Sequence, residues 1–144
     1  NGGNVDRIYA GGYGSDARVR STHLTILAGN VSAAHGAGYS GDVRGDVNIE
    51  ISGGTISSSL HGGGQSGDIY GNINVEISGG KIANVWGVGT YTSATGNTNI
   101  EISGGEITGT VYAGPHLGSL DGTASVTVSD GKVGTIYAGG YKDD

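Results

Sequence analysis

The sequence contains no cysteine, no methionine and no phenylalanine, and it has a single proline among 144 residues. The missing cysteines exclude disulfide frameworks and thiolate metal sites, although they do not fix the redox compartment. No apolar run approaches the length of a membrane span, so a membrane is not an expected partner. With 32 glycines and so little proline, the chain is expected to be rich in strands and turns rather than helical.

Positive charge is also scarce. Seven Lys and Arg stand against thirteen Asp and Glu, which gives a net charge of −6. Lys and Arg form no cluster along the sequence, so a phosphate backbone would be repelled rather than bound. Nucleic acid is therefore not an expected partner.

What the sequence does contain is a repeat with steps of 26 and 25 residues. The pattern Asn-Ile/Val-Glu-Ile-Ser occurs at 48–52, 74–78 and 99–103, each time followed by Gly-Gly. Weaker copies at 24–26 and 126–128 keep the period. Apolar and polar residues alternate within each copy, which is typical of a half-buried strand. Such a strand cannot bury its apolar side alone, so we expect identical coils stacked in register.

We therefore predict an all-β fold, a right-handed parallel β-helix (β-solenoid) of about six coils with three short strands in each coil. The handedness follows from the general preference of parallel connections and not from these residues, so a left-handed solenoid stays an alternative. A separate short strand is expected to carry the column Ile56, Ile82, Ile107 and Val133. Residues 1–144 are expected to form a single domain. Because solenoids normally need polar caps and the pattern shows none, we expect a module excised from a larger multidomain protein.

A second landmark occurs six times: an aliphatic residue, a ring-bearing residue and then small residues. Alternation places the aliphatic residue in the core and the ring on the outside. Stacked coils would bring successive rings to about 4.8 Å from one another, in a ladder along the solenoid. The rings of this first column belong to Tyr9, His35, His61, Trp86, Tyr112 and Tyr137.

A second column follows each ring after three residues, most of them small; its members are Tyr13, Tyr39, Gln65, Thr90, His116 and Tyr141. If the glycines form a floor between the two columns, the surface is a shallow groove that suits a linear polymer. Tyr and Trp pack against the C–H groups of a sugar while their polar tips bind hydroxyls. The predicted glycan-binding residues are Trp86, Tyr112, Tyr137, Tyr9, His61, His35, Tyr39, Gln65, Tyr13 and His116. Two alternatives stay open: the ladder only stabilises the strands, or the glycines only serve tight turns.

The carboxylates are not expected to be catalytic. Glu50, Glu76 and Glu101 form one column, but they are chemically alike and no wall would raise the pKa of one of them, as an acid catalyst requires. A solvated face is the preferred explanation, with weak cation binding as the alternative.

The loop carboxylates and the strand amides are interpreted as structural. Asp42 and Asp68 occupy matching loop positions, with Asp16 as a candidate third member. Turn hydrogen bonds explain them better than calcium, which needs several converging oxygens. No cofactor or metal is therefore predicted. A hydrogen-bonded amide ladder is predicted for Asn48, Asn74 and Asn99.

The coil length, the recurring Ile-Ser-Gly-Gly and the Tyr-Ala-Gly-Gly stretches resemble the pectate-lyase-like β-helix superfamily over nearly the whole chain. The resemblance implies the fold and not an activity, because the clustered Asp, Lys and Arg of its enzymes have no counterpart here. Within that superfamily, the small size and the double aromatic column are similar to the β-helical carbohydrate-binding modules of gut bacterial xylanases. This resemblance implies xylan binding by a secreted or cell-surface bacterial protein whose catalytic domain is linked covalently to the module.

The predicted function is thus a non-catalytic carbohydrate-binding module for a linear plant cell-wall polysaccharide, with xylan preferred. One alternative is a structural or adhesive stalk of a secreted or surface protein. The other is a polysaccharide lyase or hydrolase. Self-association through uncapped ends is a further expectation.

Overall fold

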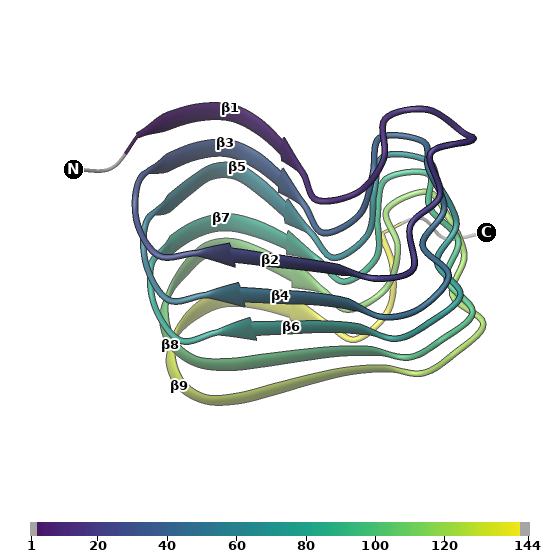
Figure 1. The fold of residues 1–144 in the computed structure, drawn as a ribbon. Coiled ribbons are helices and arrows are strands. Elements are labelled where there is room, and N and C mark those ends of the chain that lie inside the picture. Colours follow the sequence, from purple (N-terminus) through teal and green to yellow (C-terminus); the bar gives the residue numbers. More distant parts are fainter. Residues whose placement is uncertain (1–2, 142–144) are drawn as a thin grey trace.

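The computed structural model describes residues 3–141, which form a parallel β-solenoid with no helix in that range (Figure 1). Strands of two kinds alternate along the chain. One kind comprises β2 (Thr22–Ile26), β4 (Val47–Ile51) and β6 (Ile73–Ile77). The other comprises β1 (Asn4–Tyr9), β3 (Asn30–His35), β5 (Thr55–His61) and β7 (Lys81–Trp86). In the last two coils both kinds run on continuously, as β8 (Thr98–Tyr112) and β9 (Ala124–Tyr137). The predicted all-β solenoid is confirmed.

The repeat seen in the sequence is the register of the sheet. Asn48 pairs with Asn74 and Asn74 pairs with Asn99, so each coil stacks in parallel on the one before it. After the partial first coil that β1 forms, the strands complete about five turns, close to the predicted six. The right-handed sense stays a prediction.

The third strand of each coil differs from the prediction. The Ile56 column has no strand of its own, because Ile56 and Leu60 lie in the single strand β5 with a register irregularity between them. This bulge turns Ser57 and Ser58 both outward, which strict alternation does not allow. The third face is instead one isolated bridge per coil, through Val19, Val43, Ile69, Ala94 and Leu120.

The interior consists of aliphatic columns that run along the solenoid axis. Ile49, Val75 and Ile100 form one such column, and each of them is about 1% exposed. The two other main strand columns are Ile51, Ile77 and Ile102, and Ile56, Ile82 and Ile107. Stacking in register therefore buries the apolar face that a single strand would leave open. The described residues include no helix long and apolar enough to cross a membrane.

The Gly-Gly pair after each Ser has two distinct roles in the turn between the two kinds of strand. The second position is a glycine with a positive φ in all five turns, for example +82° at Gly54 and +85° at Gly80, although Ala28 and Asp130 take the first position in two of them. This left-handed conformation is costly for any residue with a Cβ atom. The first glycine lets the coils approach, because a Cβ on Gly79 would meet the carbonyl oxygen of Ser52.

The predicted amide ladder is confirmed. Nδ2 of Asn74 donates to Oδ1 of Asn48 at 3.0 Å, and Nδ2 of Asn99 donates to Oδ1 of Asn74 at 3.1 Å. The hydroxyl of Ser125 continues the ladder by donating to Oδ1 of Asn99. Each amide thus satisfies its neighbour, and the bonds fix the register between coils.

Candidate functional site

The six rings of the predicted first column form one stacked ladder, which we call the inner ladder. Its tightest contact joins Trp86 and Tyr112, whose ring centroids are 4.1 Å apart with planes 5° from parallel. The widest joins His61 and Trp86, at 6.3 Å and 10°. The ladder comprises Tyr9, His35, His61, Trp86, Tyr112 and Tyr137.

The two histidines of the inner ladder are buried. His35 is 3% exposed and His61 is 7% exposed, since each is sandwiched between neighbouring rings. Burial lowers the pKa of His35 to about 4 and that of His61 to about 3, so both imidazoles are neutral at pH 7. Nε2 of His61 lies 2.9 Å from the hydroxyl of Ser59, whereas Nδ1 of both histidines has no partner among the described residues. Both rings lie in the predicted ladder, but the rings above and below cover them, so neither presents an open face to solvent.

The second column, which we call the outer column, contacts the inner ladder through its rings. The ring of His116 lies 4.5 Å from that of Trp86. At the other end of the solenoid, Tyr39 meets Tyr9 edge to face at 5.6 Å and stacks on Tyr13 at 5.2 Å. The outer column comprises Tyr13, Tyr39, Gln65, Thr90, His116 and Tyr141. Because the two columns touch, there is no bare strip between them where they carry rings.

Most of the glycines that were predicted to floor a groove face the interior or the backbone of a neighbouring coil. A Cβ on Gly36 would meet the side chains of Ile49 and Val47, and a Cβ on Gly87 would meet Thr98. None of these glycines has a positive φ. They are small because the core and the coil spacing leave no room, and the predicted glycine floor is wrong.

Most of the exposed aromatic surface belongs to tyrosine. Six tyrosines are between 39% and 80% exposed: Tyr13, Tyr39, Tyr70, Tyr91, Tyr137 and Tyr141. Trp86 and Tyr112 are half-buried. Tyr70 and Tyr91 were missed in the sequence because no other coil has a ring at their positions. Their one signal was a large apolar side chain within a glycine-rich loop.

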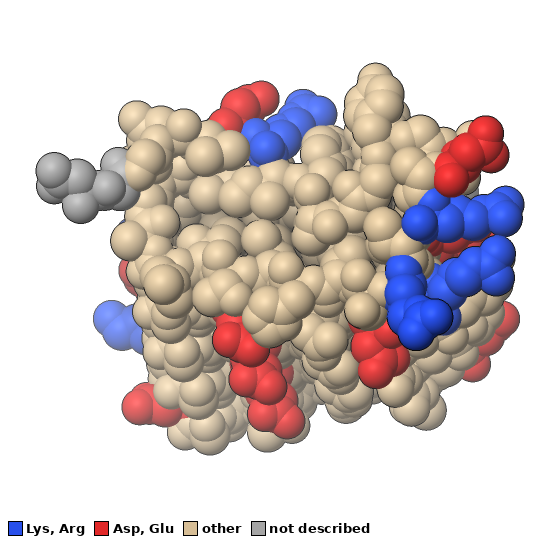
Figure 2. Space-filling model, viewed as in Figure 1, with Lys and Arg blue, Asp and Glu red and all other residues tan. Residues whose placement is uncertain are grey.

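Basic side chains from two successive coils meet at one corner of the solenoid, which we call the arginine corner. Arg18 and Arg44 line the same hollow as Asp42 and Tyr70, and Nε of Arg18 lies 3.5 Å from Oδ2 of Asp42. Figure 2 shows basic and acidic side chains gathered at the right-hand edge of the molecule, over the loops. The prediction that Lys and Arg do not cluster holds along the chain but not in space.

The Glu column lies on an exposed sheet face, as predicted. Glu50, Glu76 and Glu101 stand in register on β4, β6 and β8 and are all exposed. Nε2 of His23 lies 3.5 Å from Oε1 of Glu50. Residues 3–141 contain no group of three or more His, Asp or Glu that could hold a metal ion.

The loop aspartates act between coils. Oδ1 of Asp42 accepts the backbone N–H of Asp68 at 3.2 Å, and Oδ1 of Asp46 accepts that of Asn72 at 2.8 Å. The predicted turn hydrogen bonds are thus replaced by bonds to the next coil. Asp16 does not belong to the column, because the bridge between Val19 and Val43 aligns Arg18 with Asp42.

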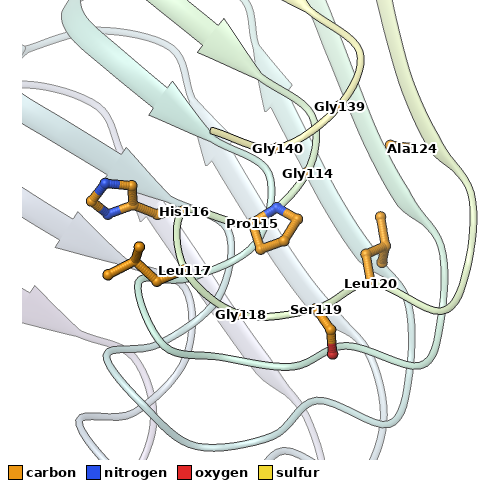
Figure 3. A pocket seen from close by; sticks show the side chains of 10 residues that line it. All are labelled: Gly114, Pro115, His116, Leu117, Gly118, Ser119, Leu120, Ala124, Gly139 and Gly140. Atoms are coloured by element: carbon orange, nitrogen blue, oxygen red, sulfur yellow. The ribbon is translucent and has the colours of Figure 1, made fainter. Parts of the chain in front are cut away.

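A hollow of about 400 Å³ lies at the last coils (Figure 3). Pro115, Leu120 and Ala124 line it together with the glycines of two successive loops. His116 is the only ionisable residue in this lining, and its ring projects to the side opposite Leu120 (Figure 3). The hollow therefore offers the hydroxyl of Ser119 and backbone polar groups beside its apolar side chains, and no set of converging ionisable groups.

Comparison of the chain with protein-family models, with curated proteins and with solved structures finds no match. The resemblance to the pectate-lyase-like superfamily and to xylan-binding modules stays a prediction beyond the solenoid fold itself. The stacked inner ladder, the exposed tyrosines and the arginine corner are the features from which a function has to be argued.

Proposed function

We propose that the chain is a non-catalytic binding module for a linear glycan, with xylan as the first ligand to test. The observation that carries the proposal is the pair of exposed rings of Tyr13 and Tyr39, stacked at 5.2 Å in the outer column. Tyr13 is 80% exposed, although exposing that much aromatic surface to water does not stabilise the fold. Such rings provide the flat apolar face, with a hydroxyl at its edge, that a sugar requires.

The outer column also suggests how a polymer would lie. Rings occupy its two ends, and the short side chains Gln65 and Thr90 occupy its middle. Tyr39 and His116 are three coil steps apart, which is about 14 Å at the spacing of parallel strands. A ligand that touches both ends must be extended along the solenoid axis, so a linear chain suits this surface better than a compact metabolite.

The role of the inner ladder changes in this proposal. Its histidines are buried and its rings are stacked face to face, so most of their faces are already occupied. We assign Tyr13, Tyr39, His116 and Tyr141 to direct contact with the glycan. Trp86 and Tyr112, which are half-buried, would support these rings and contribute an edge.

Affinity gel electrophoresis tests the proposal. The purified chain is run through gels that contain xylan, arabinoxylan, β-glucan, mannan or pectin, and through a gel without polysaccharide. We expect retardation by at least one glycan, most strongly by xylan. The double variant Tyr13→Ala/Tyr39→Ala should lose it. Tyr91→Ala should keep it, because Tyr91 is also exposed, at 58%, but is not a member of the outer column. Equal mobility in every gel would reject glycan binding.

The second candidate is a structural or adhesive stalk. The buried stacking of His35 on His61 favours it, because rings that are enclosed in this way hold coils together rather than meet a ligand. A stalk predicts that no outer-column variant changes mobility in any of the gels. It also predicts that inner-ladder variants lower the stability of the fold and change no glycan binding.

A further inference from the structure

Arg20 and Arg44 lie side by side on successive coils. Each directly follows a residue of the Val19–Val43 bridge, and the backbone N–H of Arg44 donates to the carbonyl of Val19 at 3.0 Å. The N–H of Gly45 donates to the carbonyl of Arg20 at 2.6 Å. Since paired parallel strands are about 4.8 Å apart, the two guanidinium groups leave the backbone at neighbouring positions.

The fold makes no use of this charge. Arg18 has a carboxylate partner in Asp42, at 3.5 Å. By contrast, no carboxylate of residues 3–141 lies within 4.0 Å of the side-chain nitrogens of Arg20 or Arg44. Like charges on adjacent strands destabilise a sheet. An anionic ligand would turn this unfavourable pair into a favourable one.

The third member of the same column is a ring. Tyr70 follows Ile69, which bridges Val43, and the N–H of Tyr70 donates to the carbonyl of Val43 at 2.9 Å. Its side chain is 53% exposed. Tyr70, Arg18, Asp42 and Arg44 line a hollow of about 230 Å³. Pockets for whole small molecules begin at about 300 Å³, so this hollow suits one residue of a longer ligand.

The surrounding charges limit which anion fits. Asp16, Asp42, Asp46 and Asp68 lie on the same loops, so the corner as a whole has no strong positive field. Asp42 and Asp46 each accept a backbone N–H of the next coil, which leaves them engaged with the fold. Recognition must therefore act at short range. Carboxylates spaced along a mostly neutral sugar chain meet this requirement, whereas a densely charged polyanion would be repelled by the net charge of −6.

We propose that this corner binds a uronic-acid residue of the glycan, with Arg20 and Arg44 on the carboxylate and Tyr70 against the sugar ring. Guanidinium groups match a carboxylate with two parallel hydrogen bonds, and a tyrosine face packs on sugar C–H groups. The inference rests on the proposed function, because it specifies an acidic residue of the same glycan. Arg44 is five positions after Tyr39 of the outer column, so one chain can reach both.

The test compares glucuronoxylan with the same polymer after its carboxyl groups have been reduced to alcohols. Isothermal titration calorimetry should show that the wild type binds the acidic polymer about tenfold more tightly than the reduced one, as expected for charge-assisted hydrogen bonds. Arg44→Gln should abolish this preference and keep the affinity for the reduced polymer. Arg7→Gln is the matched control, because Arg7 is also exposed but lies beside Asp6 on β1.

The outcomes separate this inference from the proposal on which it rests. Equal affinity of the wild type for both polymers overturns the uronate site and leaves glycan binding intact. Binding to neither polymer overturns both. Thermal unfolding of each variant shows whether it is folded. If Arg44→Gln is not folded, Arg44→Lys replaces it. This variant should lose most of the preference for the acidic polymer, because an ammonium cannot form the paired hydrogen bonds.

Discussion

His35 and His61 stack with their ring centroids 4.6 Å apart and their planes 4° from parallel, although both are histidines and both are buried. Two protonated imidazoles at this separation would repel each other strongly. The stack therefore favours the neutral form of both rings. Burial enforces this state by lowering both pKa values far below the ordinary 6.5.

This stack predicts that the fold loses stability in mild acid. The unfolded chain binds protons at these histidines near pH 6.5, whereas the folded chain does so only near pH 4 for His35 and pH 3 for His61. Stability is therefore complete above pH 6.5 and falls as the pH drops toward 4, by on the order of 3 kcal/mol for His35. The melting temperature measured by circular dichroism between pH 7.5 and 4.5 tests this.

The variant His35→Phe is the informative comparison, because it keeps a ring in the ladder and removes the titrating group. It should reduce the dependence of the melting temperature on pH. Tyr112→Phe serves as the control, because it also keeps a ring in the inner ladder and removes no histidine, and it should leave the acid dependence as it is in the wild type. An unchanged acid dependence in His35→Phe would show that His35 is not responsible.

The amide ladder predicts a graded loss of stability. Asn74→Ala breaks two hydrogen bonds and leaves Oδ1 of Asn48 and Nδ2 of Asn99 without partners in a half-buried position. We expect a loss of about 1–3 kcal/mol in the free energy of unfolding, measured by urea denaturation. Asn30→Ala breaks only an exposed bond to Asn4 and should cost less. Equal losses in the two variants would mean that the ladder itself contributes little.

Much of this architecture could be predicted from the sequence, because residues that pair between coils of a solenoid recur at a nearly constant interval in the sequence. The alternation around Ile49 and its copies predicted the strand, the buried face and the amide ladder. The bulge between Ile56 and Leu60 could not be predicted, because alternation indicates which side a residue faces only while the strand stays regular. The positions of the inner ladder were predicted correctly. The burial of its two histidines was not, because it depends on the rings above and below them.

The groove and the arginine corner show the same limit in the candidate site. A glycine such as Gly36 has two explanations, a ligand surface or a tight core, and only the distance to Ile49 decides between them. Arg18 and Asp42 are 24 positions apart in the sequence, one short of the regular step, so the repeat does not align them. The loop before β2 shifts the register, and only the Val19–Val43 bridge shows by how much.

The turn glycines predict a sharp difference between two substitutions by alanine. Gly54 has a φ of +82°, and a Cβ there would also meet the backbone of the previous coil. Gly54→Ala should lower the free energy of unfolding by about 1–2 kcal/mol or more. Gly14→Ala is the control, because a Cβ there meets nothing within 4 Å and φ is not positive. Chemical denaturation of both should show Gly14→Ala near the wild type, and a similar loss in both would contradict this account.

Trp86 and Tyr13 should separate stability from binding. Trp86 is half-buried, with Tyr112 at 4.1 Å on one face and His116 at 4.5 Å, so Trp86→Ala removes packing from both columns. We expect a loss of about 3 kcal/mol in the free energy of unfolding, near the lower end for a large ring that is only partly enclosed. Tyr13→Ala removes an open ring and should change stability by less than about 0.5 kcal/mol while weakening glycan binding. Thermal unfolding and affinity gels on the same two variants distinguish these effects. If Trp86→Ala kept its melting temperature and lost binding, the inner ladder would itself be the glycan-binding surface, and the assignment of the outer column would have to be reversed.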